Sequence, residues 1–148
     1  MNQLKLKRIN KELKNLNFSI TDYFVEIELN NNIYKFSLQS NFPFEPPNQF
    51  FVNNNVISYS PISFSEKELN NYNKFFDKCP CCTTILCKNN WNLNYSLINI
   101  IDEYELFKKN LKIIENISIL KKNINDDIIN YLVKTFIYPY ENPYPNRI

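Results

Sequence analysis

Four cysteines lie within one nine-residue run, Cys79-Pro80-Cys81-Cys82-Thr83-Thr84-Ile85-Leu86-Cys87. Cysteine is the most nucleophilic side chain, so such a run could supply a reactive thiol, and its thiolates could also bind a metal. A disulfide framework spreads its cysteines in order to join distant loops, and the clustering therefore argues against one. A reactive thiol is the leading interpretation, and cysteines packed as small buried side chains are the simplest alternative.

Zinc is a further interpretation of the same run. Structural zinc sites pair two ligand knuckles that are about a dozen or more residues apart, because each knuckle supplies only two convergent thiolates. Four ligands from nine residues, with Cys81 next to Cys82, would strain the backbone. We therefore expect no stoichiometric metal, no metal ligands and no cofactor, and a small zinc-binding interaction domain is the third-ranked function.

The residue types that the chain lacks exclude several other sites. Its 148 residues include no His and no Gly. Without His there is no Ser-His-Asp triad, no Cys-His dyad and no imidazole ligand or base, and without Gly there is no P-loop or dinucleotide fingerprint. Asn, Ile, Lys, Phe and Tyr make up more than half of the chain and Ala is absent, as expected of an A/T-rich genome. Turns that ordinarily use Gly must use Asn.

Composition and charge indicate the class of protein. The length predicts one domain over residues 1–148, and 44% hydrophobic residues can fill its core. A net charge of +2, from 17 basic and 15 acidic residues, is too small to indicate nucleic acid as a partner. We find neither an apolar run long enough to span a bilayer nor a signal peptide, and therefore expect no membrane partner. We expect a monomer in a reducing, cytoplasmic compartment, with the nucleus left open.

Hydrophobic periodicity predicts an α/β (α+β) fold. Apolar residues at i, i+3, i+7 and i+10 predict an amphipathic helix over residues 4–16. Alternation over 24–29 and 34–38, on either side of three asparagines, predicts a β-hairpin. The proline-rich stretch 42–47 breaks the strand, and 49–52 can pair again as a third or fourth strand.

Helices are predicted for the second half of the chain. Ser65 and Glu68 form a capping-box pattern before a short helix at 66–76. Ser96 caps a longer helix that carries apolar residues as far as Phe107. Residues 111–137 look mostly helical, with a break near 123–125, and the proline-rich tail is expected to be extended.

Four segments, taken in order, resemble the ubiquitin-conjugating (E2) family. They are Lys7-Arg8-Ile9-x-Lys11-Glu12-Leu13, Phe42-Pro43-Phe44-Glu45-Pro46-Pro47, Cys82-Thr83-Thr84-Ile85-Leu86, and Trp91. The likeness covers residues 4–104, whereas 105–148 form a divergent helical part. It implies a UBC-like fold, in which an N-terminal helix precedes a four-stranded antiparallel meander, an irregular segment with the cysteine, a central helix and C-terminal helices.

The resemblance implies an enzyme that carries ubiquitin, or a ubiquitin-like modifier, as a cysteine thioester and transfers it to an amine. Counting back from Ile85-Leu86 selects Cys82 as the catalytic residue, with Cys81 as the alternative. The family also has a His-Pro-Asn segment whose Asn supports isopeptide formation. The corresponding stretch here is Tyr59-Ser60-Pro61-Ile62, so that role is vacant or filled from elsewhere. Candidates for it are Asn73, Asn89 and Asn90.

The resemblance also implies partner-binding residues. Lys7, Arg8 and Lys11 match basic positions that contact the activating enzyme, and a solvated helix face is an equally good interpretation of them. A ligase would bind through Phe44, Leu93 and Asn94, although the last two replace residues that the family often has there. The missing His-Pro-Asn segment favours a second function from another class, a catalytically inactive binding module of the same fold.

Overall fold

The structure is a computed structural model, and it describes residues 3–38, 41–120 and 124–132. Two compact units divide the chain, Met1–Asn110 and Leu111–Ile148. The stretch that resembles the conjugating family, 4–104, lies in the first unit. The single domain expected over 1–148 stays a prediction.

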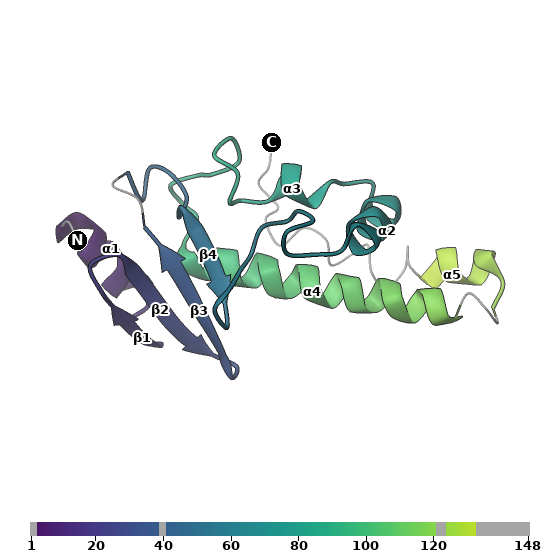
Figure 1. Cartoon of the computed structure of the whole chain (residues 1–148), viewed down its shortest axis with the longest axis horizontal. Helices are drawn as coiled ribbons and strands as arrows, with labels where there is room; N and C mark the ends of the chain where they lie inside the picture. The colour runs from purple at the N-terminus through teal and green to yellow at the C-terminus, as the bar shows by residue number, and fades with distance from the viewer. Residues whose placement is uncertain (1–2, 39–40, 121–123, 133–148) are drawn as a thin grey trace. The chain divides into compact units, whose positions relative to one another are not determined.

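The first unit contains an antiparallel sheet of five strands in sequential order. Figure 1 labels the first four of them. The strands are β1 (Asn17–Ile20), β2 (Phe24–Leu29), β3 (Asn32–Ser37), β4 (Gln49–Val52) and β5 (Asn55–Val56). The mixed α+β class is therefore confirmed, but the predicted count of four strands is wrong. The additional strand pairs only two of its residues with β4, which is too short for hydrophobic alternation to reveal it.

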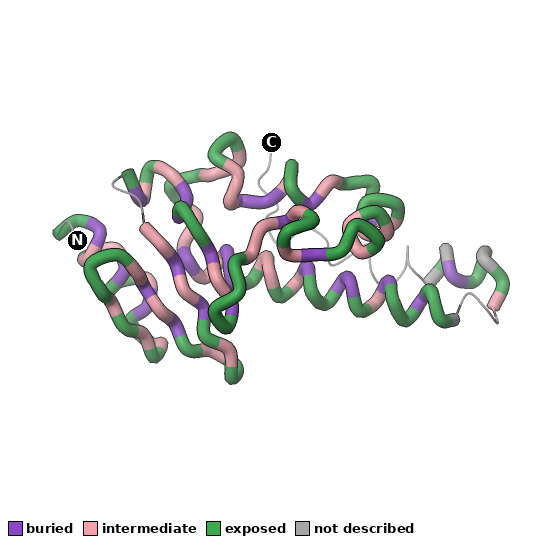
Figure 2. The backbone as a smooth tube through the Cα atoms, viewed as in Figure 1, coloured by how far each residue is buried: buried purple, intermediate pink, exposed green. Residues whose placement is uncertain are grey.

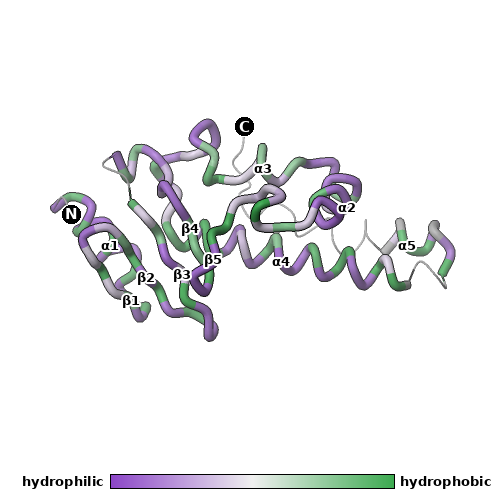
Figure 3. Tube along the Cα trace, viewed as in Figure 1, coloured by the Kyte–Doolittle hydropathy of each residue, from purple (hydrophilic) through white to green (hydrophobic). Residues whose placement is uncertain are grey.

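Two of the sheet's turns use asparagine in the left-handed region. Asn30 and Asn31, between β2 and β3, have φ of 52° and 62°, and Asn53 and Asn54, between β4 and β5, have φ of 49° and 67°. Two successive left-handed residues match the twist of the strands in a tight hairpin, and Asn tolerates this region better than any other residue except Gly. The predicted asparagine hairpin is confirmed, and the second such turn creates β5. Both turns are hydrophilic (Figure 3).

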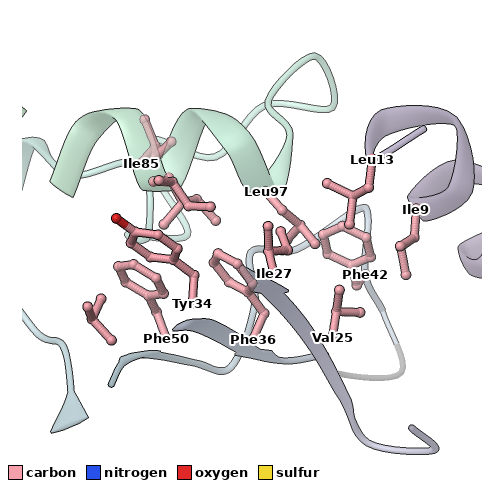
Figure 4. Packing of buried hydrophobic residues seen from close by; sticks show 13 residues of the cluster. Ile9, Leu13, Val25, Ile27, Tyr34, Phe36, Phe42, Phe50, Ile85 and Leu97 are labelled. Carbon is pink, nitrogen blue, oxygen red and sulfur yellow. The ribbon is translucent and has the colours of Figure 1, made fainter. Parts of the chain in front are cut away.

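The core lies between the sheet, the N-terminal helix and the start of the long helix. Helix α1 (Gln3–Glu12) ends earlier than the predicted residue 16, but the apolar stripe is confirmed because Ile9 and Leu13 are fully buried. Rings from the sheet pack beneath α4 (Leu97–Leu120), as Figure 4 shows. The buried cluster comprises Ile9, Leu13, Val25, Ile27, Tyr34, Phe36, Phe42, Phe50, Val52, Ile85, Leu97, Ile100 and Ile101.

Helix α2 (Glu66–Phe76) has the bounds that the sequence predicts. The Ser65 hydroxyl accepts from the Glu68 backbone N–H at 3.2 Å, and the Glu68 carboxylate accepts from the Ser65 backbone N–H at 2.8 Å, so the predicted capping box is present. An aromatic group joins α2 to α4, with the Tyr72 and Phe107 ring centroids 4.7 Å apart. On both sides of α2 the chain alternates between exposed, half-buried and buried residues (Figure 2).

The predicted C-terminal helices are confirmed in part. At the start of α4, the Ser96 hydroxyl accepts from the Asn99 backbone N–H, and the Asn99 side-chain oxygen accepts from the Ser96 backbone N–H. This is the arrangement expected of a capping residue. The helix then continues to Leu120 without a second start at residue 111. Helix α5 (Asp126–Leu132) begins after the predicted break. The expected extended tail lies outside the described residues.

Candidate active site

The cysteines lie on and around a helix of one turn, α3 (Pro80–Thr83). Cys79 precedes the helix as its N-cap residue, and its carbonyl accepts from the backbone N–H groups of Cys82 and Thr83 at 3.1 Å each. Pro80 suits the first helical position, because it needs no N–H there and its φ is already helical. Cys81 and Cys82 are exposed, so neither serves the core as a buried side chain.

Three sulfurs converge on one side of this turn. The Sγ atoms of Cys79, Cys81 and Cys82 all lie within 4.8 Å of one another, with 2.7 Å between Cys79 and Cys81 and 3.7 Å between Cys81 and Cys82. One helical turn thus brings three of the four sulfurs together, whereas four ligands from so short a run were expected to strain the backbone. Cys87, half-buried, does not belong to this group.

The pKa values of Cys79 and Cys81 are shifted in opposite directions. A hydrogen bond from the Cys81 thiol lowers the pKa of Cys79, and that bond raises the pKa of Cys81 to about 12. Cys79 is thus the member of the pair that is more readily a thiolate. The sequence argument did not select Cys79 as the carrier, because it matches no position of the family. The signal that was available is its place directly before Pro80, which is typical of an N-cap.

Glu103 of α4 fixes the residues that follow the cysteines. Its carboxylate accepts the Thr84 hydroxyl at 2.7 Å and the Ile85 backbone N–H at 3.0 Å. Bonds to a carboxylate are stronger than those between neutral groups, and Ile85 is itself fully buried in the core. Sequence reasoning missed Glu103, although it lies three residues after Ile100 and four before Phe107, on the apolar side of the helix.

Asn90 fixes the same stretch from its C-terminal side. Its side-chain amide donates to the Cys82 carbonyl at 2.7 Å and to the Thr84 carbonyl at 3.0 Å. Of the three asparagines considered for the vacant role, it is the one that bonds the cysteine's own backbone, whereas Asn73 and Asn89 are exposed. Both amide hydrogens of Asn90 are engaged by backbone carbonyls, so the geometry assigns it to holding the loop.

The proline-rich segment lies beside the loop that follows the cysteines. The Trp91 indole Nε1 donates to the Pro43 carbonyl at 2.8 Å, and its ring packs against Phe42 with centroids 6.2 Å apart. Lys88 forms an ion pair with Glu45 at 3.2 Å. The indole of Trp91 thus packs against the proline-rich segment, and the ion pair directs Lys88 toward Glu45.

The residues expected to bind a ligase lie on these two adjoining segments. Phe44 is 75% exposed and Leu93 is 49% exposed. Asn94 is exposed as well. The structure thus brings the segments of all three residues to one region of the first unit and leaves their side chains accessible.

The three basic residues of α1 that were expected to contact an activating enzyme have different surroundings. Lys7 and Lys11 are exposed. The Arg8 guanidinium instead bonds Glu12 at 2.6 Å and the carbonyls of Leu93 and Tyr95 at 2.7 Å each. Arg8 therefore joins α1 to the loop before α4, which is a structural role that sequence reasoning did not foresee.

The stretch 59–62, which the resemblance aligns with His-Pro-Asn, serves packing. The Tyr59 ring is buried and meets the Phe107 ring edge-on, with centroids 5.0 Å apart. Burial raises the pKa of its hydroxyl well above the ordinary tyrosine value. Next to it, the Ser58 and Ser60 hydroxyls bond each other at 2.7 Å, and Ser63 donates to the Val56 carbonyl at 2.9 Å.

Comparison of the chain with protein-family models, curated proteins and solved structures found no match. The resemblance to conjugating enzymes therefore depends on the residues quoted above. Among the described residues, none of the helices has both the length and the apolar character that a membrane-spanning helix requires.

Proposed function

We propose that the protein is a divergent ubiquitin-conjugating enzyme with a UBC-like fold, and that Cys82 carries ubiquitin or a ubiquitin-like modifier as a thioester. The observation that carries the proposal is an exposed Cys82 on a one-turn helix, directly before residues bonded to Glu103 and Asn90. A carrier thiol must be accessible to two large partners in turn, and its backbone must stay in place while they exchange. Both requirements are met around Cys82.

The proposed chemistry consists of two acyl transfers. In the first, the Cys82 thiolate attacks the modifier's C-terminal thioester carbonyl on the activating enzyme, and the activating enzyme's thiolate leaves. In the second, an uncharged amine attacks the new thioester, the Cys82 thiolate leaves, and the amine loses a proton. A thiolate is a good leaving group in both steps, so the activation of the acyl group is conserved without an imidazole base.

The second candidate is an inactive binding module of the same fold. It is favoured by the Tyr59-Ser60-Pro61 stretch, whose side chains pack or bond one another in place of supplying an amide to the cysteine. The isopeptide step would then lack its usual support. An exposed cysteine at the matching position favours the enzyme, because a module without activity needs no thiol there.

A charging assay tests the proposal. The full chain is incubated with an activating enzyme, ATP and a panel of ubiquitin-like proteins, and adducts are resolved with and without a reducing agent. We expect wild type to form a thiol-sensitive adduct and Cys82→Ser to form a stable oxyester or none. Cys87→Ser is the matched control and should charge normally, as should Cys79→Ser.

Two other outcomes of the charging assay would count against the proposal. An adduct that survives in Cys82→Ala and is lost in Cys81→Ala would move the carrier by one residue and contradict the assignment of Cys82. Failure of wild type to charge with any modifier would favour the binding module.

The partners follow from the same proposal. The activating enzyme would contact the exposed Lys7 and Lys11 of α1, and a ligase would contact the exposed Phe44 and Leu93 with Asn94 beside them. We propose a monomeric enzyme that acts in the cytoplasm. Phe44→Ala should slow ligase-stimulated discharge while leaving charging unchanged, because Phe44 is separate in sequence from the cysteines.

A further inference from the structure

We propose that Cys79, Cys81 and Cys82 form a binding site for one thiophilic closed-shell cation, Zn²⁺ or Cu(I). Soft thiolate ligands select these ions over magnesium, calcium or manganese. The three Sγ atoms already lie within 4.8 Å of one another without any ion. The site therefore needs little rearrangement of the backbone in order to form.

The separations of the sulfurs fit a shared ion. With a Zn–S bond of about 2.3 Å, two sulfurs on one tetrahedral ion are about 3.8 Å apart. Cys81 and Cys82 are 3.7 Å apart. Cys79 and Cys81 are closer, with 2.7 Å between their Sγ atoms. The exposed Cys81 side chain would have to move outward by about 1 Å to reach the tetrahedral spacing.

Charge balance also suits a cation here. Binding converts each thiol into a thiolate, so one ion releases up to three protons to the solvent. Of the two basic residues that flank the run, Lys78 is exposed and Lys88 is paired with Glu45.

The site would be open and separate from the folding core. Only three of the described residues converge in this group, which leaves a fourth position for water or an external ligand on Zn²⁺, or a three-coordinate site for Cu(I). The core of the first unit is built from thirteen apolar side chains, and no cysteine belongs to it. The chain should therefore fold without the ion, unlike a zinc-dependent domain.

One consequence rests on the proposed function of Cys82. An ion bound by its sulfur would withdraw that thiolate from thioester formation, so metal occupancy and charging would exclude each other. Free metal would then switch the conjugating activity off, and a chelator would switch it on. The metal site itself stands on the geometry of the three sulfurs and holds whether or not the chain conjugates anything.

Metal binding is tested on the full chain, reduced and freed of metal. Zn²⁺ affinity is measured by competition with a chromophoric zinc chelator, and Cu(I) affinity by competition with a Cu(I)-specific chelator under anaerobic conditions. These two arms show which ion the site prefers. Cd²⁺ titration counts the thiolates through its thiolate-to-metal charge-transfer absorption. We expect one equivalent, three thiolates, and an unchanged far-UV circular dichroism spectrum in the metal-free chain.

Single substitutions identify the ligands. Cys79→Ser, Cys81→Ser and Cys82→Ser should each weaken binding by about tenfold or more, because each removes one of three ligands. Cys87→Ser, half-buried and outside the group, is the matched control and should bind as wild type does. Less than one equivalent in wild type, or equal losses in Cys87→Ser and Cys82→Ser, would overturn the proposal. So would wild-type affinity in the variant that lacks all three ligands.

The effect of bound metal on thioester formation is measured in a separate assay. Zn²⁺ or Cu(I) at saturation should abolish thioester formation, and a chelator should restore it. If the metal-free chain never charges while it binds one equivalent of metal, the proposed function fails and the metal site stands. If it charges equally with the site saturated, Cys82 is not a ligand, and the proposed three-cysteine site is wrong.

Discussion

Between β2, β3 and β4 the buried side chains are apolar and aromatic. In residues 57–91, here called the connecting segment, the stretch that follows the cysteines is also held by polar side chains. In the sheet, the Phe36 and Phe50 rings stack with centroids 4.9 Å apart. In the connecting segment, the backbone around the cysteines is bonded to Glu103 and Asn90. Buried apolar area is non-directional and shared by many residues, while a hydrogen bond depends on two groups. The position of the thiols therefore depends on a few particular side chains.

The largest expected effect comes from the sheet. Phe50→Ala should lower the free energy of unfolding by about 3–5 kcal/mol, because it leaves a cavity between Phe36 and Tyr104. Urea unfolding followed by circular dichroism measures this loss. Phe51→Ala, one residue along on the opposite and less buried face, is the matched control and should cost clearly less. Equal losses would contradict the burial that distinguishes the two faces.

A smaller and more local effect is expected in the connecting segment. Glu103→Gln weakens the acceptor for Thr84 and Ile85, and should cost about 1–3 kcal/mol. Hydrogen exchange should accelerate at the amides of residues 82–86 and change little in β3. Asp102→Asn, next to it and exposed, is the control and should leave exchange at those amides unchanged. Uniform acceleration over both regions would mean that Glu103 supports the whole core.

The smallest effect is a dependence on pH at the start of α2. The hydrogen bond from the Ser65 side chain, followed by that from its backbone N–H, lowers the pKa of Glu68 below the ordinary value of 4.5. Because the folded-state pKa is the lower one, this stabilisation is complete above 4.5 and is lost as the pH falls through the folded-state value. Glu68→Gln should flatten the fall in urea midpoint over that acidic range.

The same acid titration of Glu66→Gln, in the same helical turn, serves as the control. It should retain the wild-type dependence, because the capping box uses Glu68. A wild-type slope in Glu68→Gln would contradict the capping box as its source. Solvent screening at this exposed helix start keeps the expected change small.

Much of the local structure follows from the sequence alone. The bounds of α2 and β4, the asparagine hairpin and the buried stripe of α1 match their predictions. Each depends on neighbours within a few residues: a capping pair, an alternating run, or apolar residues spaced by a helical turn. Such signals are contained in the local chain, so they do not require knowledge of what packs against them. The composition likewise decides which residue makes the turns, because Gly is absent.

The tertiary structure decides the surroundings of the thiols. Glu103 is 21 residues from Cys82 along the chain, and Arg8 reaches carbonyls 85 and 87 residues away. Bonds of this kind depend on how the elements pack, and no spacing in the sequence specifies them. The convergence of three sulfurs was missed for a different reason: linear spacing suggested strain, whereas one helical turn brings residues 79, 81 and 82 to a common side. Side-chain chemistry is fixed by residue type, but which groups share a proton or an ion is fixed by distance in three dimensions.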